Sequence, residues 1–147
     1  VVQRVTRARV VVESATVGEI GVGMLVLLGI DRGDSESEVV QLATKLAGYR
    51  FFRDDAGKTN RAVTEVAAAA LVVSQFTLCA AVDKGRRPSF DGAEEPSRAR
   101  ALCEAFVARL RELGVPTQSG VFGAHMEVEL VNDGPVTLVF EAGARSA

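Results

Sequence analysis

The residue types that could carry chemistry in this chain point first to hydrolysis. Nucleophilic hydrolysis needs a base beside a serine, threonine or cysteine, and His125 is the single histidine of the chain. Ser74 lies in Val-Val-Ser-Gln-Phe, which is not the Gly-x-Ser-x-Gly motif of a nucleophile elbow. A conventional esterase that uses Ser74 or Thr77 with His125 as base is therefore one hypothesis. A histidine flanked by Ala124 and Met126 is, however, more often a packing or surface residue than a general base.

Metal and dinucleotide chemistry find little support in the sequence. Cys79 and Cys103 are far apart and form no Cys-x-x-Cys motif, so a zinc site would need carboxylates to complete it. We expect no metal and no cofactor, and we expect both cysteines to be buried free thiols. Gly18, Gly21 and Gly23 precede a strand instead of opening a helix, so we interpret them as hairpin glycines and not as a dinucleotide fingerprint.

Paired carboxylates do not define a catalytic site either. Glu94 and Glu95 precede a predicted helix, as acidic residues commonly do, and Asp133 lies in a predicted turn. By elimination, an enzyme built from this chain would need its substrate to supply the reactive group.

Length and composition limit the classes of protein that are possible. The chain has 147 residues, which favours one domain over residues 1–147. Its formal net charge is −2, so binding to nucleic acid through bulk positive charge is excluded and any RNA contact must be local. No uninterrupted apolar run is long enough for a membrane span, and the first ten residues do not resemble a signal peptide. We therefore expect a cytoplasmic protein without a membrane partner.

The first half of the chain predicts an antiparallel start and one helix. Residues 5–12 and 16–20 are β-branched runs, and residues 24–30 form a buried apolar run. Asp34 or Ser35 can cap a helix whose apolar positions recur at helical spacing up to Gly48. Residues 50–52 and 69–78 read as further strands, the second of which contains Ser74.

The second half predicts a loop, a long helix and a final group of strands. Residues 83–95 contain two glycines and a proline and read as a long surface loop. Pro96 opens a helix that Gly114 closes, and strands are expected at 117–121, 126–131 and 136–141. Asp133-Gly134 predicts a hairpin between the last two. These elements indicate an α+β fold with a mixed or mainly antiparallel sheet and two long helices.

Three short segments, taken together, are more specific than any one of them. They are Gln3-Arg4-Val5, Ser74-Gln75-Phe76-Thr77-Leu78 and Asn132-Asp133-Gly134-Pro135-Val136-Thr137. Gly-x-Arg-Pro-Ser-Phe at 85–90 and Gly-Val-Phe-Gly-Ala at 120–124 support them. With these motifs the chain resembles, essentially end to end, the D-aminoacyl-tRNA deacylase family, also called the D-tyrosyl-tRNA deacylase family.

The resemblance implies a homodimeric esterase with a barrel-like core that frees tRNA mischarged with D-amino acids or glycine. It implies that the strand with Ser74, Gln75, Phe76 and Thr77 lines the catalytic pocket. It further implies that the Gly134–Pro135 peptide, in cis, enters from the partner subunit and screens substrate chirality. The remaining residues that it suggests are Arg4 as a brace, Val136 and Thr137 as supports, and Phe122 and Met126 as contacts for the adenine. At His125 the family commonly has Asp.

The chemistry of an aminoacyl ester agrees with the missing base. The ester is activated and its ribose carries a vicinal hydroxyl, so the RNA can assist hydrolysis while backbone N–H groups stabilise the oxyanion. In a strand, Gln75 and Thr77 would point to one face and Ser74 and Phe76 to the other, so the motif must lie at a strand end or bulge if more than one pair is used.

Two points stay open at the level of sequence. Lys84, Arg86 and Arg87 could contact phosphates of the tRNA acceptor stem, or they could be no more than a solvated loop. The alternative to an enzyme is a non-catalytic RNA-binding dimer that protects charged tRNA ends.

Overall fold

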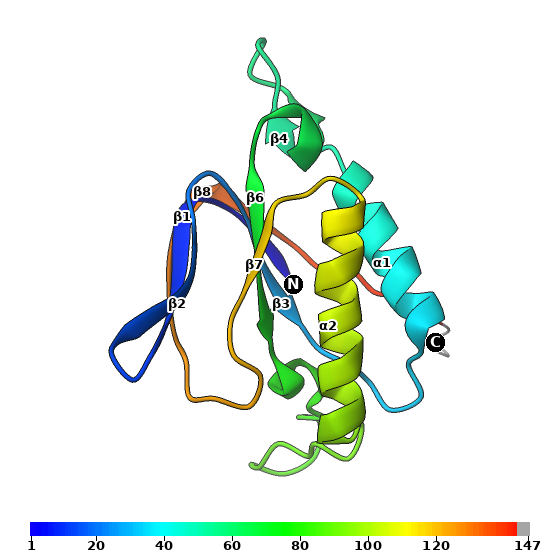
Figure 1. Ribbon diagram of the computed structural model, residues 1–147. Coiled ribbons are helices and arrows are strands. Elements are labelled where there is room, and N and C mark those ends of the chain that lie inside the picture. The colour runs from blue at the N-terminus through cyan, green and yellow to red at the C-terminus, as the bar shows by residue number, and fades with distance from the viewer. Residues whose placement is uncertain (144–147) are drawn as a thin grey trace.

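The computed structural model of the protein describes residues 1–143, four residues fewer than the expected domain of 1–147 (Figure 1). Two helices, α1 and α2, lie side by side and cover one face of a curved sheet (Figure 1). The elements in chain order are β1 (Val2–Val12), β2 (Ala15–Ile20), β3 (Gly23–Leu28), α1 (Glu36–Gly48), β4 (Phe52–Arg53), β5 (Thr59–Arg61), η1 (Val63–Glu65), β6 (Ala69–Ser74), η2 (Phe76–Cys79), α2 (Pro96–Glu112), β7 (Thr117–Ser119) and β8 (Glu127–Leu138).

Strand β1 organises the larger sheet. It pairs antiparallel with β8 along one edge and with β2 and β3 along the other. Ala8 of β1 faces Ile20 of β2, and Val5 of β1 faces Gly23 of β3. Three steps along β1 thus match three steps from β2 to β3, so β2 and β3 pair with β1 in one register, as a single interrupted strand would. Strand β3 then pairs parallel with β6, and β6 pairs parallel with β7. The sheet is therefore mixed, and the α+β prediction is confirmed.

The sheet curls into a nearly closed barrel because β2 returns close to the end of β7. A Cβ atom added at Gly18 in β2 would lie 2.7 Å from the backbone oxygen of Ser119. A Cβ added at Gly23 would lie 1.9 Å from the oxygen of Ala69. Gly18 and Gly23 thus permit close strand contact, and neither lies in the turn of a hairpin. The hairpin turn itself lies at Glu13 and Ser14, which have φ of 48° and 66°.

Burial on both faces explains why β3 and β6 are continuous apolar runs instead of alternating ones. In β6, Ala70 and Val72 pack under the helices, whereas Leu71 and Val73 point into the second core cluster, within the curl of the sheet. In β3, Met24 and Leu25 divide in the same way. The two faces of the sheet thus carry two separate hydrophobic clusters.

Both helices begin at the predicted signals. Ser35 caps α1 and forms a capping box with Glu38, which stabilises the first turn. Pro96 occupies the first turn of α2, and the Glu95 side chain accepts backbone hydrogen bonds there. Gly114 follows the end of α2 with a φ of 86°, a conformation that glycine adopts without a steric cost.

The predicted strand over residues 69–78 is too long. Strand β6 ends at Ser74, and residues 76–79 form the short 3₁₀ helix η2. The N–H of Gln75 still donates to the Leu28 oxygen at 2.8 Å, but β3 leaves the sheet at Leu28. The chain beyond Gln75 therefore has no neighbouring strand on that side to continue the ladder.

The predicted hairpin at residues 132–135 was also wrong. Residues 127–138 are a single strand, β8, and both of its halves pair with β1. Gln3 faces Thr137 and Val5 faces Asn132, so two steps along β1 correspond to five along β8. The residues between them form a large bulge in β8 instead of a turn. The strand does not reverse there, because it pairs with β1 on both sides of the bulge.

Candidate functional site

The segment predicted to line the catalytic pocket lies at the end of β6, where the chain turns into η2. Ser74 is the last strand residue, Phe76 begins the 3₁₀ turn and Gln75 links the two. The amide of Gln75 donates a hydrogen bond to the Thr77 hydroxyl oxygen. The first hydrogen bond of the turn runs from the Leu78 N–H to the Gln75 oxygen at 3.2 Å. The N–H groups of Phe76 and Thr77 precede this bond, so the turn itself offers them no acceptor.

An exposed aromatic surface adjoins this turn. Phe76 has 59% of its surface exposed, which is unusual for a large apolar side chain, and Leu78 has 40% exposed. The ring of Phe76 contacts Phe90 of the loop before α2, with the centroids 5.0 Å apart. The same loop carries Lys84, Arg86 and Arg87, all exposed.

The structure places Ser74 and Phe122 in the wall of one cavity and separates Met126 from it. This cavity lies between α2 and the segment after β7, and its volume is about 230 Å³. Met126 packs instead against the second core cluster, and its sulfur limits the space at Gly120. The two predicted adenine contacts therefore lie in different places: Phe122 lines the cavity, and Met126 packs on the second core cluster.

The bulge of β8 holds the Gly134–Pro135 peptide in cis, the isomer that the family resemblance implies. Gly134 has a φ of 136°, and a Cβ there would lie 2.9 Å from the Val136 nitrogen. The Asn132 side chain accepts a hydrogen bond from that nitrogen at 3.2 Å, and Thr137 beyond it accepts one from Gln3 at 3.3 Å. The supports predicted at Val136 and Thr137 thus belong to the base of the bulge.

Arg4 is buried directly beneath this bulge. Its Nε donates to the Asp133 backbone oxygen at 3.1 Å, and its Nη1 donates to the Phe51 oxygen at 2.8 Å. The carboxylate of Asp133 lies 3.5 Å from Arg4 and 3.8 Å from Arg53 of β4. Arg4, a residue that is only 3% exposed, therefore connects the bulge to Phe51 in the segment after α1.

The two halves of the predicted site are far apart within one chain. Asn132 faces Val5, which faces Gly23, which faces Ala69 at the start of β6. The bulge thus lies about 10–16 Å before Ser74 along the sheet and three strand spacings, about 14 Å, away from it across the sheet. Gly134 does not reach the Ser74–Thr77 segment of its own chain.

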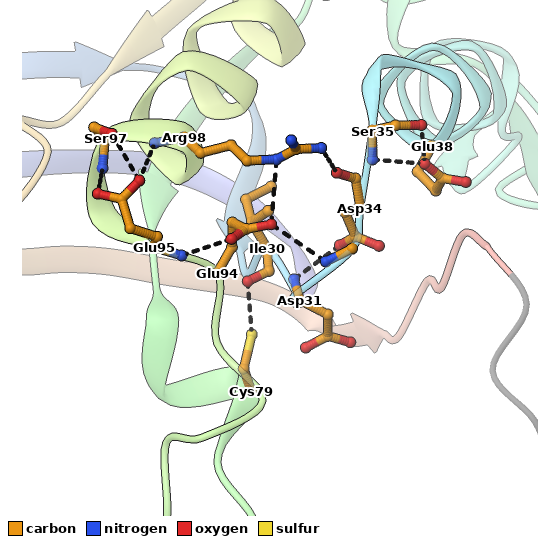
Figure 2. Close-up of polar contacts among 11 residues, drawn as sticks. Ile30, Asp31, Asp34, Ser35, Glu38, Cys79, Glu94, Glu95, Ser97 and Arg98 are labelled. Carbon is orange, nitrogen blue, oxygen red and sulfur yellow. Dashed lines mark hydrogen bonds and ion pairs between the residues drawn. The ribbon is translucent and has the colours of Figure 1, made fainter.

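Polar contacts fix the loops behind the 3₁₀ turn, as Figure 2 shows. Arg98 at the start of α2 lies 3.2 Å from the Glu94 carboxylate and donates to the Asp34 backbone oxygen at 2.8 Å. The thiol of Cys79, the last residue of η2, donates to the Ile30 oxygen at 3.4 Å. Burial, together with neighbouring carboxylates, raises the pKa of Asp34. The network joins the entries of both helices and gives η2 a fixed support.

His125 is exposed and is not placed as a general base. Within residues 1–143, no hydrogen bond joins His125 to Ser74 or Thr77. Both cysteines are free thiols; Cys103 is buried and Cys79 is half-buried. Burial, with a smaller contribution from the Glu104 carboxylate, raises the pKa of Cys103 to about 11, so this thiol is neutral at physiological pH.

Two residues near these segments were missed at the level of sequence. Arg53 contacts Asp133, and Arg100 of α2 lies over the Phe122 ring. Both contacts join residues that are distant in the chain, and no local motif marks either arginine.

Two negative observations apply to the described part of the chain. Among residues 1–143, no three His, Cys, Asp or Glu side chains gather as a metal site would require. Over the same residues, neither helix has the length and apolar character needed to cross a bilayer.

Comparison with known proteins gives matches that span almost the whole chain. Residues 1–141 match the family described as D-Tyr-tRNA(Tyr) deacylase. A D-aminoacyl-tRNA deacylase of Geobacter sulfurreducens is 53% identical over 147 residues, which covers 100% of this chain and 97% of the relative. One of Deinococcus radiodurans is 54% identical over 141 residues, which covers 96% and 97%.

Solved structures agree with this fold. The c-Myc DNA Unwinding Element Binding Protein superposes with a TM-score of 0.91 at 39% identity, over 97% of each chain. A probable eukaryotic D-amino acid tRNA deacylase has a TM-score of 0.76 at 19% identity, over 91% of this chain and 93% of its own, and shares the fold.

Proposed function

The chain belongs to the D-Tyr-tRNA(Tyr) deacylase family, and from this membership we propose that it hydrolyses the ester bond between a D-amino acid and the terminal adenosine of tRNA. The observation that carries the proposal is the identity of 53% with a curated D-aminoacyl-tRNA deacylase over the full length of the chain. We expect the reaction to proofread chirality for translation in the cytoplasm.

We propose that hydrolysis proceeds without a protein base. Water attacks the ester carbonyl carbon, the bond to the ribose oxygen breaks, and that oxygen takes a proton as the D-amino acid leaves. The neighbouring ribose hydroxyl assists the proton transfer, which agrees with the absence of a positioned histidine. The backbone N–H groups of Phe76 and Thr77 donate to the developing oxyanion, because the 3₁₀ turn leaves them without an internal acceptor. The side chains of Ser74, Gln75 and Thr77 line the pocket around the ester.

The chiral screen is proposed to come from a second copy of the chain. The separation of Gly134 from Ser74 in one chain supports this, since neither segment can complete the site alone. The large exposed surface of Phe76 also supports a partner at this turn. Carbonyl oxygens of the rigid Gly134–Pro135 unit hold the amino group and Cα–H of the substrate, so the side chain of an L-amino acid collides with the peptide. Arg4 keeps this unit in place through Asp133.

The screen acts on the Cβ atom of the wrong enantiomer, so it cannot reject an amino acid that has none. Glycine attached to tRNA is therefore a predicted substrate together with D-amino acids. This consequence separates a steric screen from a pocket that binds a D-side chain.

The experiment that tests the function is release of amino acid from tRNA charged with D-tyrosine, glycine or L-tyrosine. We expect fast release of D-tyrosine and glycine and slow release of L-tyrosine. Equal release of both tyrosine enantiomers would overturn the screen. Tight binding of the tRNAs charged with D- and L-tyrosine, without turnover, would favour the non-catalytic RNA-binding dimer.

A second substrate tests assistance by the RNA. A substrate that lacks the hydroxyl next to the ester should be cleaved much more slowly, and full-speed cleavage would overturn assistance by the RNA.

The exposed loop before α2 is proposed to contact the acceptor stem. Lys84, Arg86 and Arg87 lie on the loop that packs against Phe76 through Phe90. Reversing the charges of Arg86 and Arg87 should raise KM for charged tRNA, most strongly at low salt. An unchanged KM would assign these residues to the solvated surface alone.

A further inference from the structure

The cavity between α2 and the segment after β7 contains cationic residues that the proposed reaction has not used. Arg100, Arg111 and Glu104 of α2 form one side of it, and Ser74 with Phe122 forms part of the other. Its volume of about 230 Å³ is below that of a typical ligand pocket, so it can admit only part of a large substrate. The participation of Ser74 places this cavity directly beside the proposed ester site.

Arg100 differs from every other arginine of α2 in what it contacts. Arg98 pairs with Glu94 at 3.2 Å, Arg109 pairs with Glu112 at 3.1 Å, and Arg111 donates to the Thr117 backbone oxygen at 2.8 Å. Arg100 lies over the Phe122 ring with its guanidinium carbon 5.3 Å from the ring centre. Within residues 1–143 it has neither an ion pair nor a hydrogen bond.

This kind of contact leaves a guanidinium ready to bind an anion. A cation–π contact holds the guanidinium over the ring without using its N–H donors, which stay available. A carboxylate partner would have occupied those donors and neutralised the charge. A guanidinium held this way suits bidentate recognition of a phosphate.

The covalent structure of the proposed substrate puts a phosphate within reach of this position. The terminal ribose carries the aminoacyl ester on one side and the phosphodiester to the preceding nucleotide on the other. A site for the ester at Ser74–Thr77 therefore has a phosphate within about the width of one sugar. Arg100 and Arg111 together outweigh the single negative charge of Glu104 on this wall.

We propose that the cavity beside Ser74 receives the phosphodiester of the terminal adenosine and that Arg100 is its contact residue, held in position by Phe122. This inference rests on the proposed function and adds a phosphate subsite to the same site.

The test compares two substrates in the full-length protein. D-tyrosyl-tRNA contains the phosphodiester, whereas D-tyrosyl-adenosine has the same ester and no phosphate. The substitution Arg100→Gln should raise KM for the tRNA about tenfold at low salt with little change in kcat, as expected for one lost charge-assisted contact. The slope of the salt dependence of kcat/KM should become shallower by about 0.7, the value for one phosphate contact on a single strand. Hydrolysis of D-tyrosyl-adenosine should stay as in the wild type.

Two further variants make the result specific. Arg109→Gln removes the same charge from the same helix outside the cavity, where Arg109 pairs with Glu112 of its own helix, and it should leave KM for the tRNA nearly unchanged. Glu104→Gln removes the opposing charge within the cavity and should lower KM for the tRNA. A raised KM for Glu104→Gln would overturn the electrostatic assignment.

The outcomes separate this inference from the function on which it rests. If the wild type releases D-tyrosine from neither substrate, the proposed function fails. If the wild type is active and Arg100→Gln is indistinguishable from it on the tRNA, only the phosphate subsite fails. An equal loss on both substrates would likewise overturn the subsite, because it would show that Arg100 supports the fold and contacts no phosphate.

Discussion

The side chains of Gln75 and Thr77 are hydrogen-bonded to each other, so the backbone is the part of this turn that is best placed to act on a substrate. No side chain among Ser74, Gln75 and Thr77 is paired with a base in the described residues. This arrangement fits an ester that needs polarisation and correct placement more than it needs a nucleophile. It also makes the proposed chemistry sensitive to changes in the main chain and tolerant of several side-chain changes.

Replacing Thr77 tests the backbone donor directly. Thr77→Pro removes the N–H of residue 77, and proline is tolerated in the first turn of a helix because of its fixed φ. We expect kcat to fall about a hundredfold or more, as for loss of an oxyanion donor. Thr77→Ala keeps the N–H and removes the hydroxyl, so it should lose far less. Equal losses in the two variants would assign the role to the hydroxyl, and the melting temperature of each variant checks that it is folded.

His125→Ala separates the two enzymatic hypotheses. The side chain is exposed and has no hydrogen bond with Ser74 or Thr77 in the described residues, so we expect little change in kcat/KM for D-tyrosyl-tRNA. A general base would cost about a hundredfold or more on removal. A loss of that size, with the fold intact by circular dichroism, would restore the conventional esterase.

At the scale of elements, local sequence patterns predicted helices well and strand pairing less well. Ser35 and Pro96 mark their helix starts because capping depends only on neighbouring residues. The length of β6 depends on where β3 leaves the sheet, and the bulge at Gly134 depends on β1, more than 100 residues earlier in the chain. An Asp-Gly pair favours a turn locally. Here the residues before and after the pair both bond to β1, so the chain forms a bulge and continues as one strand. The family resemblance named the segments of the proposed site, while their placement needed the fold.

Closure of the barrel at Gly18 gives a prediction for stability. In Gly18→Ala the new Cβ would lie 2.7 Å from the Ser119 oxygen, a backbone atom that cannot rotate away. Moving β7 to relieve the contact should lower the free energy of unfolding by about 1–3 kcal/mol, as for other overpacked sites. Gly21→Ala is the matched control, since a Cβ there meets nothing within 4 Å. Urea denaturation measures both, and a Gly18 variant as stable as the control would contradict the close contact.

At the scale of the whole molecule, the sheet keeps the proposed catalytic turn and the Gly134 bulge at a distance that one chain does not bridge. Arg4, and Arg53 of β4, contact Asp133 of the bulge. In Figure 1, β4 lies at one end of the molecule, and η2 with the loop before α2 lies at the opposite end. The proposed twofold dimer would bring each such pair together twice, because an isologous interface repeats every contact. The sequence could name both segments, but only the register of the strands shows that they cannot meet within a subunit.

Subunit mixing tests whether the screen acts across the interface. Gly134→Ala strains a residue with φ of 136° and places a Cβ 2.9 Å from the Val136 nitrogen, so its homodimer should have defective screens beside intact catalytic turns. Thr77→Pro gives the reverse, with intact screens beside defective turns. Each homodimer should be nearly inactive on D-tyrosyl-tRNA.

In a mixed dimer, the pocket with the intact turn receives the intact screen from the other chain. Random exchange should therefore restore about a quarter of the wild-type sites. Recovery after co-refolding, absent when the two homodimers are only combined without exchange, supports a shared site. If each chain used its own Gly134, no mixture would recover activity, because every pocket would keep the defect encoded in its own chain.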